Sequence, residues 1–189
     1  MSQSDTTILK AEIRARMRSA RLAHAAVASP ITPPAAFLDV LHHPGIIASY
    51  VAMPGEADPT LLARAAHDRG WAIALPHVTH RSLPMRFLAW QPGELLVTGP
   101  FGLRQPPADA PALRPDIVLT PLLAFDRALN RLGQGAGYYD RAFADLPAVL
   151  RIGVAWSIQG VDTLPADPWD VALHGVIDEY GWNEPEMTP

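Results

Sequence analysis

Short apolar runs alternate with helix-like segments along most of this chain, and that alternation constrains the fold more than any other feature. The runs are rich in β-branched and aromatic residues, which is typical of buried strands. Strands that alternate with helices predict a mostly parallel sheet with helices on both faces. We therefore expect a single-domain, Rossmann-like three-layer α/β protein over residues 1–189, with residues 1–7 and 181–189 as frayed tails.

Periodicity and turn residues place the individual elements. Helices are expected over residues 8–28, 35–42, 59–69, and from the glycine-rich turn at 133–137 to residue 145. Strands are expected over residues 46–52, 71–76, 85–90, 116–123, 151–156 and 172–177. The proline-bearing segment 104–115 is expected to form a surface loop.

The first expected helix carries two stripes of residues. Apolar side chains at helical spacing should face the core, and these are Leu9, Ile13, Met17 and Ala20. Basic side chains four residues apart should form a cationic stripe, and these are Lys10, Arg14 and Arg18. Taken alone, such a stripe is typical of a solvated helix face, although Lys10 is the only lysine in the chain.

Composition argues against several classes of protein. Hydrophobic residues make up 49% of the chain and charged residues 18%, which is enough for a core and too apolar for global disorder. The net charge of −4 lacks the basic excess of a nucleic-acid-binding protein. The most apolar run, residues 117–125, is too short to span a bilayer and contains Pro121. We therefore expect neither a nucleic acid nor a membrane as a partner.

Cellular location follows from two further observations. The sequence has no cysteine, so disulfides and thiolate chemistry are excluded, which suits a reducing compartment. Its first residues are polar and lack the apolar stretch of a signal peptide. A cytoplasmic location is expected. The sequence does not determine the oligomeric state, and a monomer is favoured.

The segment LLAFDRALNRLGQGAGYYDR, residues 122–141, is the strongest indication of a binding site. Its three alternating glycines, Gly133, Gly135 and Gly137, lie between a buried strand and a helix. Glycines there expose backbone N–H groups to an anion, and the helix N-terminus adds a partial positive charge. The glycines alone fit a plain structural turn equally well, since they match neither a Walker A loop nor G-x-G-x-x-G.

The residues around these glycines resemble the signature of the 5-formyltetrahydrofolate cyclo-ligase family, with FD, RLG and GYYDR in order. The likeness extends from about Lys10 to Asp178. It includes the K-x-x-x-R of Lys10 and Arg14, SYVAMPGEADPTLL at 49–62, FGLRQP at 101–106 and IGVAWSIQGVDTLPADPWD at 152–170. The chain differs from many members of the family at Gln134 and Ala136, and it has Phe101 where some have Trp.

The resemblance implies an enzyme that converts 5-formyltetrahydrofolate to 5,10-methenyltetrahydrofolate while ATP is cleaved to ADP and phosphate, with Mg²⁺ as the cofactor. The implied course is phosphorylation of the formyl oxygen, attack by N10 on the activated carbon, and loss of phosphate. A formamide is a poor electrophile with a poor leaving group, and phosphorylation corrects both defects. The protein then has mainly to position groups and neutralise phosphate charge.

The resemblance also implies roles for individual residues, position by position. Those implied to bind ATP are Lys10, Arg14, Arg131, Leu132, Gly133, Gln134, Gly135, Ala136, Gly137, Tyr138 and Tyr139. Those implied to contact the folate are Met53, Glu56, Asp58, Phe101 and Tyr138. The implied Mg²⁺ ligands, hard oxygens suited to a phosphate-bound cation, are Asp140 and Asp170. No residue is assigned a proton-transfer role.

Several of these residues also have purely structural explanations. Asp58 can cap the helix that follows it, and Asp140 can favour the dipole of its own helix. Tyr138 and Tyr139 can be core aromatics. His77 and His80 are given no metal role, because two histidines without a third ligand are usually loop residues.

Two other functions stay open at this point. The first is a diverged paralogue that acts on another heterocyclic or phosphorylated substrate, which the departures at Gln134 and Ala136 favour. The second is a non-enzymatic sensor of a phosphate-bearing ligand, because similar α/β sheets serve as effector-binding domains.

Overall fold

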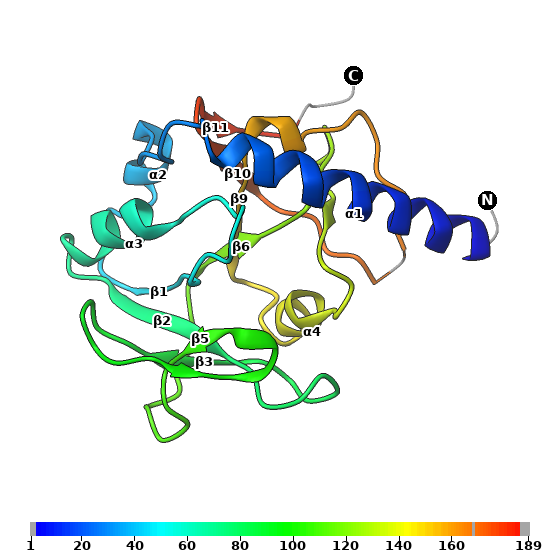
Figure 1. The fold of residues 1–189 in the computed structure, drawn as a ribbon. Helices are drawn as coiled ribbons and strands as arrows, with labels where there is room; N and C mark the ends of the chain where they lie inside the picture. Colours follow the sequence, from blue (N-terminus) through cyan, green and yellow to red (C-terminus); the bar gives the residue numbers. More distant parts are fainter. Residues whose placement is uncertain (1–2, 168, 186–189) are drawn as a thin grey trace.

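The computed structural model describes residues 3–167 and 169–185, and Figure 1 shows its arrangement. The strands of the main sheet are β1 (Ile46–Ala48), β2 (Ala72–His77), β3 (Arg86–Ala89), β6 (Ile117–Pro121), β9 (Leu150–Val154), β10 (Gly175–Asp178) and β11 (Gly181–Asn183). Two small sheets pair β4 (Val97–Thr98) with β5 (Arg104–Gln105) and β7 (Ala124–Phe125) with β8 (Arg131–Leu132). The helices are α1 (Gln3–Ala25), α2 (Ala35–Asp39), α3 (Thr60–His67) and α4 (Tyr138–Asp145), with 3₁₀ turns η1 (Pro100–Gly102) and η2 (Ser157–Gln159).

The main sheet has the strand order β11-β10-β9-β6-β1-β2-β3. Its five inner strands are parallel, and the edge strands β3 and β11 are antiparallel to their neighbours. The predicted α/β class with a mostly parallel sheet is therefore confirmed. The chain winds outward from β1 through β2 on one side and through β6, β9 and β10 on the other, so the direction of winding reverses between β1 and β6.

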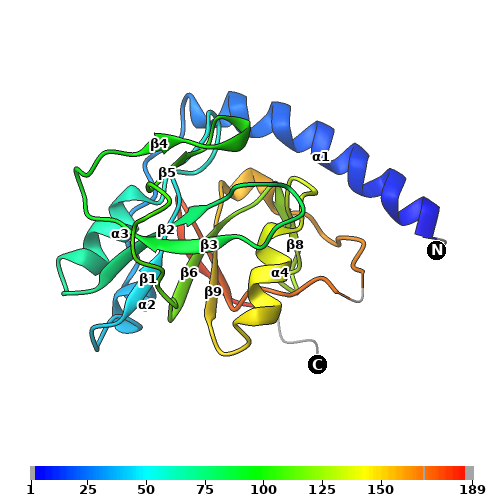
Figure 2. The same cartoon turned by 90° about the horizontal axis from the view of Figure 1, so that it is seen from below.

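Alternating side chains of the strands supply a core on each face of the sheet. Ile47 belongs to the cluster that α2 and α3 cover, together with Phe37 and Leu62. Its neighbour Ala48 belongs to the opposite cluster, which Phe143 of α4 covers. The helices thus form outer layers on both faces, as Figures 1 and 2 show. None of the described helices has the length and apolar character needed to cross a membrane.

Helix α1 lies across the domain rather than in either outer layer, and its first turns extend beyond the body of the protein in both views (Figures 1 and 2). Ile13 and Met17 are buried against the β7–β8 hairpin. Leu9, predicted to face the core, is instead 38% exposed, while its neighbour Lys10 is only 8% exposed. The prediction for Leu9 is wrong because the buried stripe of α1 runs through Thr6, Lys10, Ile13 and Met17.

The C-terminal end of α1 is held by a buried polar cluster. His24 Nε2 lies 2.8 Å from Glu179 Oε1, and Ser157 donates to the same carboxylate from its hydroxyl (2.7 Å) and its backbone N–H (2.9 Å). Burial alone would raise the pKa of Glu179, but the hydrogen bonds from Ser157 and His24 outweigh burial and lower it below its usual 4.5. The His24 ring also meets the Trp156 indole edge-on at 5.8 Å.

Three predicted segments differ from the structure. Residues 3–7 belong to α1, and β11 pairs with β10, so the predicted frayed tails at 1–7 and 181–189 are both too long. The predicted loop 104–115 contains β5. The Ala89 N–H donates to the Pro111 carbonyl and the Leu113 N–H donates to the Phe87 carbonyl, so this segment covers the edge of β3. An exposed sheet edge invites pairing with other chains, which gives this cover its physical reason.

We expect Glu179→Gln to lower the free energy of unfolding by about 1–3 kcal/mol at pH 7, since hydrogen bonds to a charged group are lost. A carboxylate with a lowered native pKa stabilises the fold above its unfolded pKa and loses that effect as pH falls through the native value. The difference between the two proteins should therefore be constant above about pH 5 and shrink below the usual pKa of 4.5. Urea denaturation across this range measures it, and a difference that grows on acidification would contradict the assignment.

Candidate active site

A cavity of about 360 Å³ opens at the carboxyl ends of the central parallel strands. Tyr50 and Val51 follow β1, Val78 follows β2, Pro121 ends β6 and Leu122 follows it, and all five line the cavity. The cavity therefore lies where the winding of the sheet reverses, between β1 and β6. In open α/β sheets this is the position at which ligands bind.

The glycine-rich loop 133–137 forms one wall of this cavity between β8 and α4. Gly135 has φ +96° and Gly137 has φ +68°, a backbone region that side chains with a Cβ rarely adopt. Ala136 between them is not among the described residues with positive φ, so the alanine fits there without strain. The loop leads directly into the N-terminus of α4, whose dipole favours an anion.

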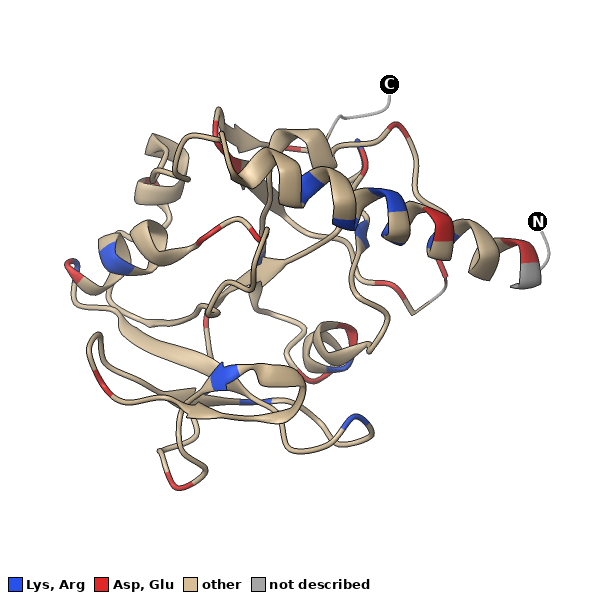
Figure 3. Ribbon diagram, in the orientation of Figure 1, with Lys and Arg blue, Asp and Glu red and all other residues tan. Residues whose placement is uncertain are grey.

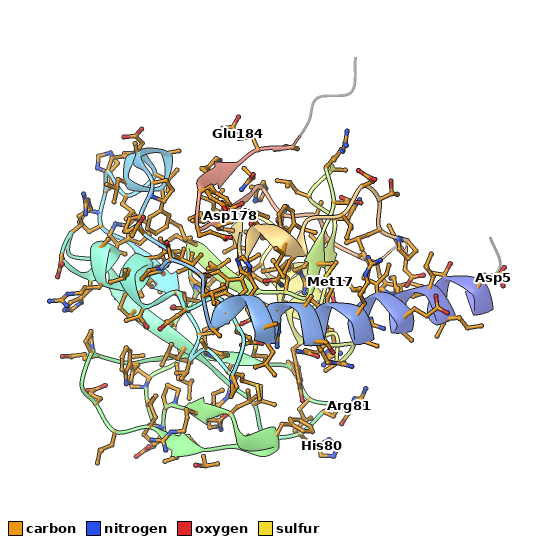
Figure 4. All side chains as sticks on the ribbon, turned by 45° about the horizontal axis from the view of Figure 1, so that its top comes forward. Asp5, Met17, His80, Arg81, Asp178 and Glu184 are labelled. Carbon is orange, nitrogen blue, oxygen red and sulfur yellow. The ribbon has the colours of Figure 1, made fainter. Side chains whose placement is uncertain are left out.

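Arginines from three parts of the chain surround the loop. They come from α1, from α4 and from the connection between β2 and β3. Figure 4 labels Arg81 in that connection, and Figure 3 shows that basic residues recur along α1. The contacts are Arg14 Nε with Gly133 O (2.9 Å), Arg18 Nε with Gln134 Oε1 (3.1 Å), Arg81 with Gly135 O (3.5 Å) and Arg141 with Ala136 O (3.1 Å). This concentration of guanidinium groups makes the loop attractive to an anion.

Lys10 lies between two carboxylates rather than in solvent. Its Nζ is 2.6 Å from Asp167 and 2.7 Å from Asp170, and the Asp167 N–H donates to the same Asp170 oxygen at 2.8 Å. Burial alone would lower the pKa of Lys10, but these two carboxylates outweigh it and raise the pKa above 10.5. The ammonium is therefore protonated at neutral pH, and the explanation of Lys10 as a solvated side chain is wrong.

Arg131 and Asp140 form a second ion pair on the cavity wall. The Arg131 side chain is 4% exposed, and its guanidinium carbon lies 5.8 Å from the centre of the Tyr139 ring and 5.7 Å from that of Phe143. Arg131 Nε is buried and makes no hydrogen bond within the described residues. Asp140 and the two aromatic rings thus fix the guanidinium of Arg131, and its Nε–H still lacks a hydrogen-bond acceptor among the described residues.

Another part of the lining, called here the apolar wall, includes Met53, Met85 and Leu103. Glu56 also lines the cavity, and its Oε2 accepts the Met53 N–H at 3.0 Å. The Tyr50 hydroxyl donates to the Ala57 carbonyl at 2.6 Å, and burial raises the pKa of Tyr50 well above 10. The Tyr50 phenol is therefore neutral and serves this loop as a hydrogen-bond donor.

Two aromatic residues complete the lining. Phe101 is 64% exposed and has φ +60°, a left-handed conformation that costs a non-glycine residue on the order of 1 kcal/mol. Strain of this kind persists where the surroundings enforce it and is enriched at ligand sites. The Tyr138 hydroxyl is buried without a partner among the described residues, and the Arg141 guanidinium lies 5.3 Å from its ring centre.

All residues predicted to form the site line this one cavity, with a single exception. Asp58 is exposed and does not line the cavity. Its carboxylate accepts hydrogen bonds from the Thr60 N–H (2.9 Å) and hydroxyl (2.5 Å) at the start of α3. The predicted N-cap position is wrong by one residue, because Pro59 is the N-cap and Thr60 the first helical residue. Asp58 still accepts the first N–H group of α3 from just outside the helix.

Sequence reasoning missed many of the residues that line the cavity, of which Arg21 had the clearest signal. Arg21 lies on the same face of α1 as Lys10 and Arg14, because positions 10, 14 and 21 fall within about 40° of one another around a helix axis. The others have no comparable pattern. The missed residues with polar side chains are Arg21, Tyr50, Arg81, Arg104 and Asp167.

The donor set of the cavity suits a magnesium-bound phosphate only in part. Asp140 and Asp170 both line the cavity, but each is paired with a cation, Arg131 and Lys10 respectively. Among the described residues no group of three or more His, Asp or Glu side chains could enclose a metal ion by itself. Mg²⁺ typically needs just one or two carboxylates, because waters and substrate phosphates complete its shell. The two aspartates fit that requirement.

Comparisons with known proteins agree on one family. The model of the 5-formyltetrahydrofolate cyclo-ligase family matches residues 3–179. A Haemophilus influenzae protein named 5-formyltetrahydrofolate cyclo-ligase is 32% identical over 69% of this chain and 74% of its own length, and one from Mycolicibacterium smegmatis is 34% identical over 69% and 72%. The structure of Aquifex aeolicus 5,10-methenyltetrahydrofolate synthetase is similar with a TM-score of 0.71 and 25% identity, covering 96% of this chain and 95% of the other.

We expect Lys10→Met to destabilise the protein by about 1–3 kcal/mol, because two neighbouring carboxylates lose their cation in a partly exposed position. Adding Asp167→Asn should restore part of that loss by removing one of the repelling charges. Urea denaturation measures both changes, and Arg16→Met, an exposed position on the same helix, is the control with a change within about 0.5 kcal/mol. An unchanged midpoint for Lys10→Met would show that the pairs contribute nothing.

Proposed function

Because the chain belongs to the 5-formyltetrahydrofolate cyclo-ligase family, we propose that its cavity binds ATP and 5-formyltetrahydrofolate side by side. The enzyme converts 5-formyltetrahydrofolate to 5,10-methenyltetrahydrofolate at the expense of ATP, as the family does. One observation carries the assignment to this cavity: a glycine loop surrounded by arginines and a set of apolar side chains with Glu56 line the same space. The first suits phosphates and the second suits a flat heterocycle with polar edges.

The proposed chemistry proceeds in two steps. The formyl oxygen of the folate attacks the γ-phosphorus of ATP, so that an O–P bond forms and the bond to ADP breaks. N10 then attacks the activated formyl carbon, its proton is lost, and the carbon–oxygen bond breaks as phosphate leaves. Both steps develop charge on phosphate oxygens, so catalysis rests on positioning and on electrostatic stabilisation.

The nucleotide side of the proposed site consists of the loop 133–137, its flanking residues and the cations of α1. Lys10 and Arg14 would approach the phosphates from the helix, and the N-terminus of α4 from the opposite side. In this structure Lys10 is paired with Asp167 and Asp170, so a phosphate that takes this ammonium competes with them. Arg131 would contribute the Nε donor that has no other partner among the described residues. Leu132 and Tyr139 would support the loop from the core.

The proposed cofactor is Mg²⁺, held by Asp140 and Asp170. When bound, it would neutralise charge on the phosphates that are being transferred. The carboxylates can serve in this way because each already lies on the cavity wall beside a phosphate-binding cation.

The folate side of the proposed site is the apolar wall. Met53 and Phe101 would cover the faces of the pterin, and Tyr138 would contact its edge with the hydroxyl that is buried without a partner among the described residues. Glu56 would accept hydrogen bonds from the pterin. Asp58 would act only at a distance, by fixing the start of α3 behind this wall.

The two departures from the family's loop fit this function. Gln134 keeps its side chain hydrogen-bonded to Arg18, and Ala136 takes up no strained conformation. Neither observation favours a different substrate. We also propose a cytoplasmic location, which the absence of cysteine supports.

The purified protein should form 5,10-methenyltetrahydrofolate from 5-formyltetrahydrofolate only when ATP and a divalent cation are both present. The measurement is the absorbance of the methenyl product, with ADP followed in parallel and with reactions lacking ATP or containing EDTA as controls. Product formed at the full rate in EDTA would overturn the metal proposal. ATP cleavage with another heterocycle alone would indicate a paralogue, and binding without turnover would indicate a sensor.

A further inference from the structure

Arg21 is a buried cation on the wall of the cavity that none of the proposed steps uses. Its side chain is 7% exposed, and one terminal nitrogen lies 3.4 Å from Glu56 Oε1 and 3.4 Å from the Leu122 carbonyl oxygen. Leu122 directly follows β6, and Glu56 belongs to the loop after β1. Arg21 therefore connects the two strand ends between which the cavity opens.

The contacts of Glu56 leave its carboxylate able to bind a ligand. An ionised carboxylate has about four lone-pair positions. The Met53 N–H takes one on Oε2, and the Arg21 guanidinium lies against Oε1. The Glu56 side chain is itself 8% exposed, so two positions remain in a largely desolvated place on the cavity wall. A pterin presents a ring N–H and an amino group side by side, and such a pair of donors matches one carboxylate.

The backbone of this loop is held independently of Arg21. A Cβ on Gly55 would lie 3.1 Å from the Leu22 Cα, so the loop packs directly on the backbone of α1. The Gly55 carbonyl also accepts a hydrogen bond from the Trp156 indole at 3.0 Å, and the Tyr50 hydroxyl donates to Ala57. Removal of Arg21 should thus free the carboxylate of Glu56 while the loop keeps its place.

We propose that Arg21 is a positioning residue that aims the Glu56 carboxylate at the pterin ring of the folate. An unpaired buried carboxylate is costly and turns toward any available donor or toward water. Arg21 fixes it by charge, and the Leu122 carbonyl fixes Arg21 in turn. Because Arg21 shares its helix face with Lys10 and Arg14, helix α1 then serves both substrates of the reaction. This inference rests on the proposed function, since it assumes that Glu56 faces a folate.

A double-mutant cycle tests the proposal. The proteins are wild type, Arg21→Met, Glu56→Gln and the combination of both, with Arg16→Met as the control on the exposed face of α1. Titration calorimetry measures the Kd for 5-formyltetrahydrofolate and, separately, for ATP. Thermal melts show whether each variant is folded.

We expect Arg21→Met to raise the Kd for 5-formyltetrahydrofolate about tenfold or more, since a Glu56 carboxylate that turns away from the pterin loses its charge-assisted hydrogen bonds to the ring. Its Kd for ATP should stay within about twofold, and the double variant should bind folate as Glu56→Gln does, because Arg21 acts through Glu56. Fold-changes that multiply would overturn the proposal, as would wild-type folate binding by Arg21→Met. If Arg21→Met does not fold, the same cycle with Arg21→Gln, which removes the charge but keeps a polar side chain, decides on the same criteria.

The proposed function and this inference fail in different ways. If the wild-type protein binds and converts 5-formyltetrahydrofolate while Arg21→Met behaves as wild type, only the role of Arg21 is wrong. If the wild-type protein does not bind 5-formyltetrahydrofolate, both are wrong.

Discussion

The attachment of helix α1 through its cations, across the carboxyl ends of the sheet, is the interaction on which the rest of the site depends. Lys10 meets two carboxylates, Arg14 meets the glycine loop, and Arg21 meets the end of β6 and the loop after β1. The sheet alone would leave the cavity open on this side. Because these three cations lie on one face of one helix, α1 both covers the cavity on this side and supplies part of its positive charge.

This arrangement ties the stability of α1 to the function of the site. Ile13 and Met17 are the large buried apolar side chains in the described part of α1, whereas Thr6 and Lys10 are its buried residues nearer the N-terminus. Polar contacts therefore carry much of the attachment, and in a partly exposed place such contacts contribute modestly. The same side chains would also contact the phosphates and the folate. Helix α1 should therefore be attached more firmly when ligands are bound than when they are not.

The sequence was sufficient for the layers and for the position of the glycine loop, because long apolar runs and glycine spacing carry those features. The resemblance to a known family supplied a large part of the cavity lining, but not residues such as Arg21, Tyr50 and Met85. It was insufficient where only two or three residues form an element, as in β4, β5, β7 and β8, since such strands are too short to show a period of two. In the turn between β10 and β11, the Asp178 carboxylate accepts the N–H groups of Tyr180 and Gly181. This turn was missed because the residues that follow it are polar and were predicted to be a frayed tail. Leu9 was predicted to be buried because it follows the apolar spacing of the helix. The buried residue is its neighbour Lys10, because two aspartates distant in sequence pair with the ammonium.

Amide hydrogen exchange of α1 tests most directly whether this helix closes the site. The measurement compares the amides of residues 8–21 in the free protein with those in the protein saturated with a non-hydrolysable ATP analogue, Mg²⁺ and 5-formyltetrahydrofolate, using α3 as an internal reference. The account predicts exchange in α1 slowed at least about tenfold by the ligands while α3 is unchanged, because opening of a weakly attached element is suppressed by whatever binds it. Equal exchange of α1 with and without ligands would contradict it.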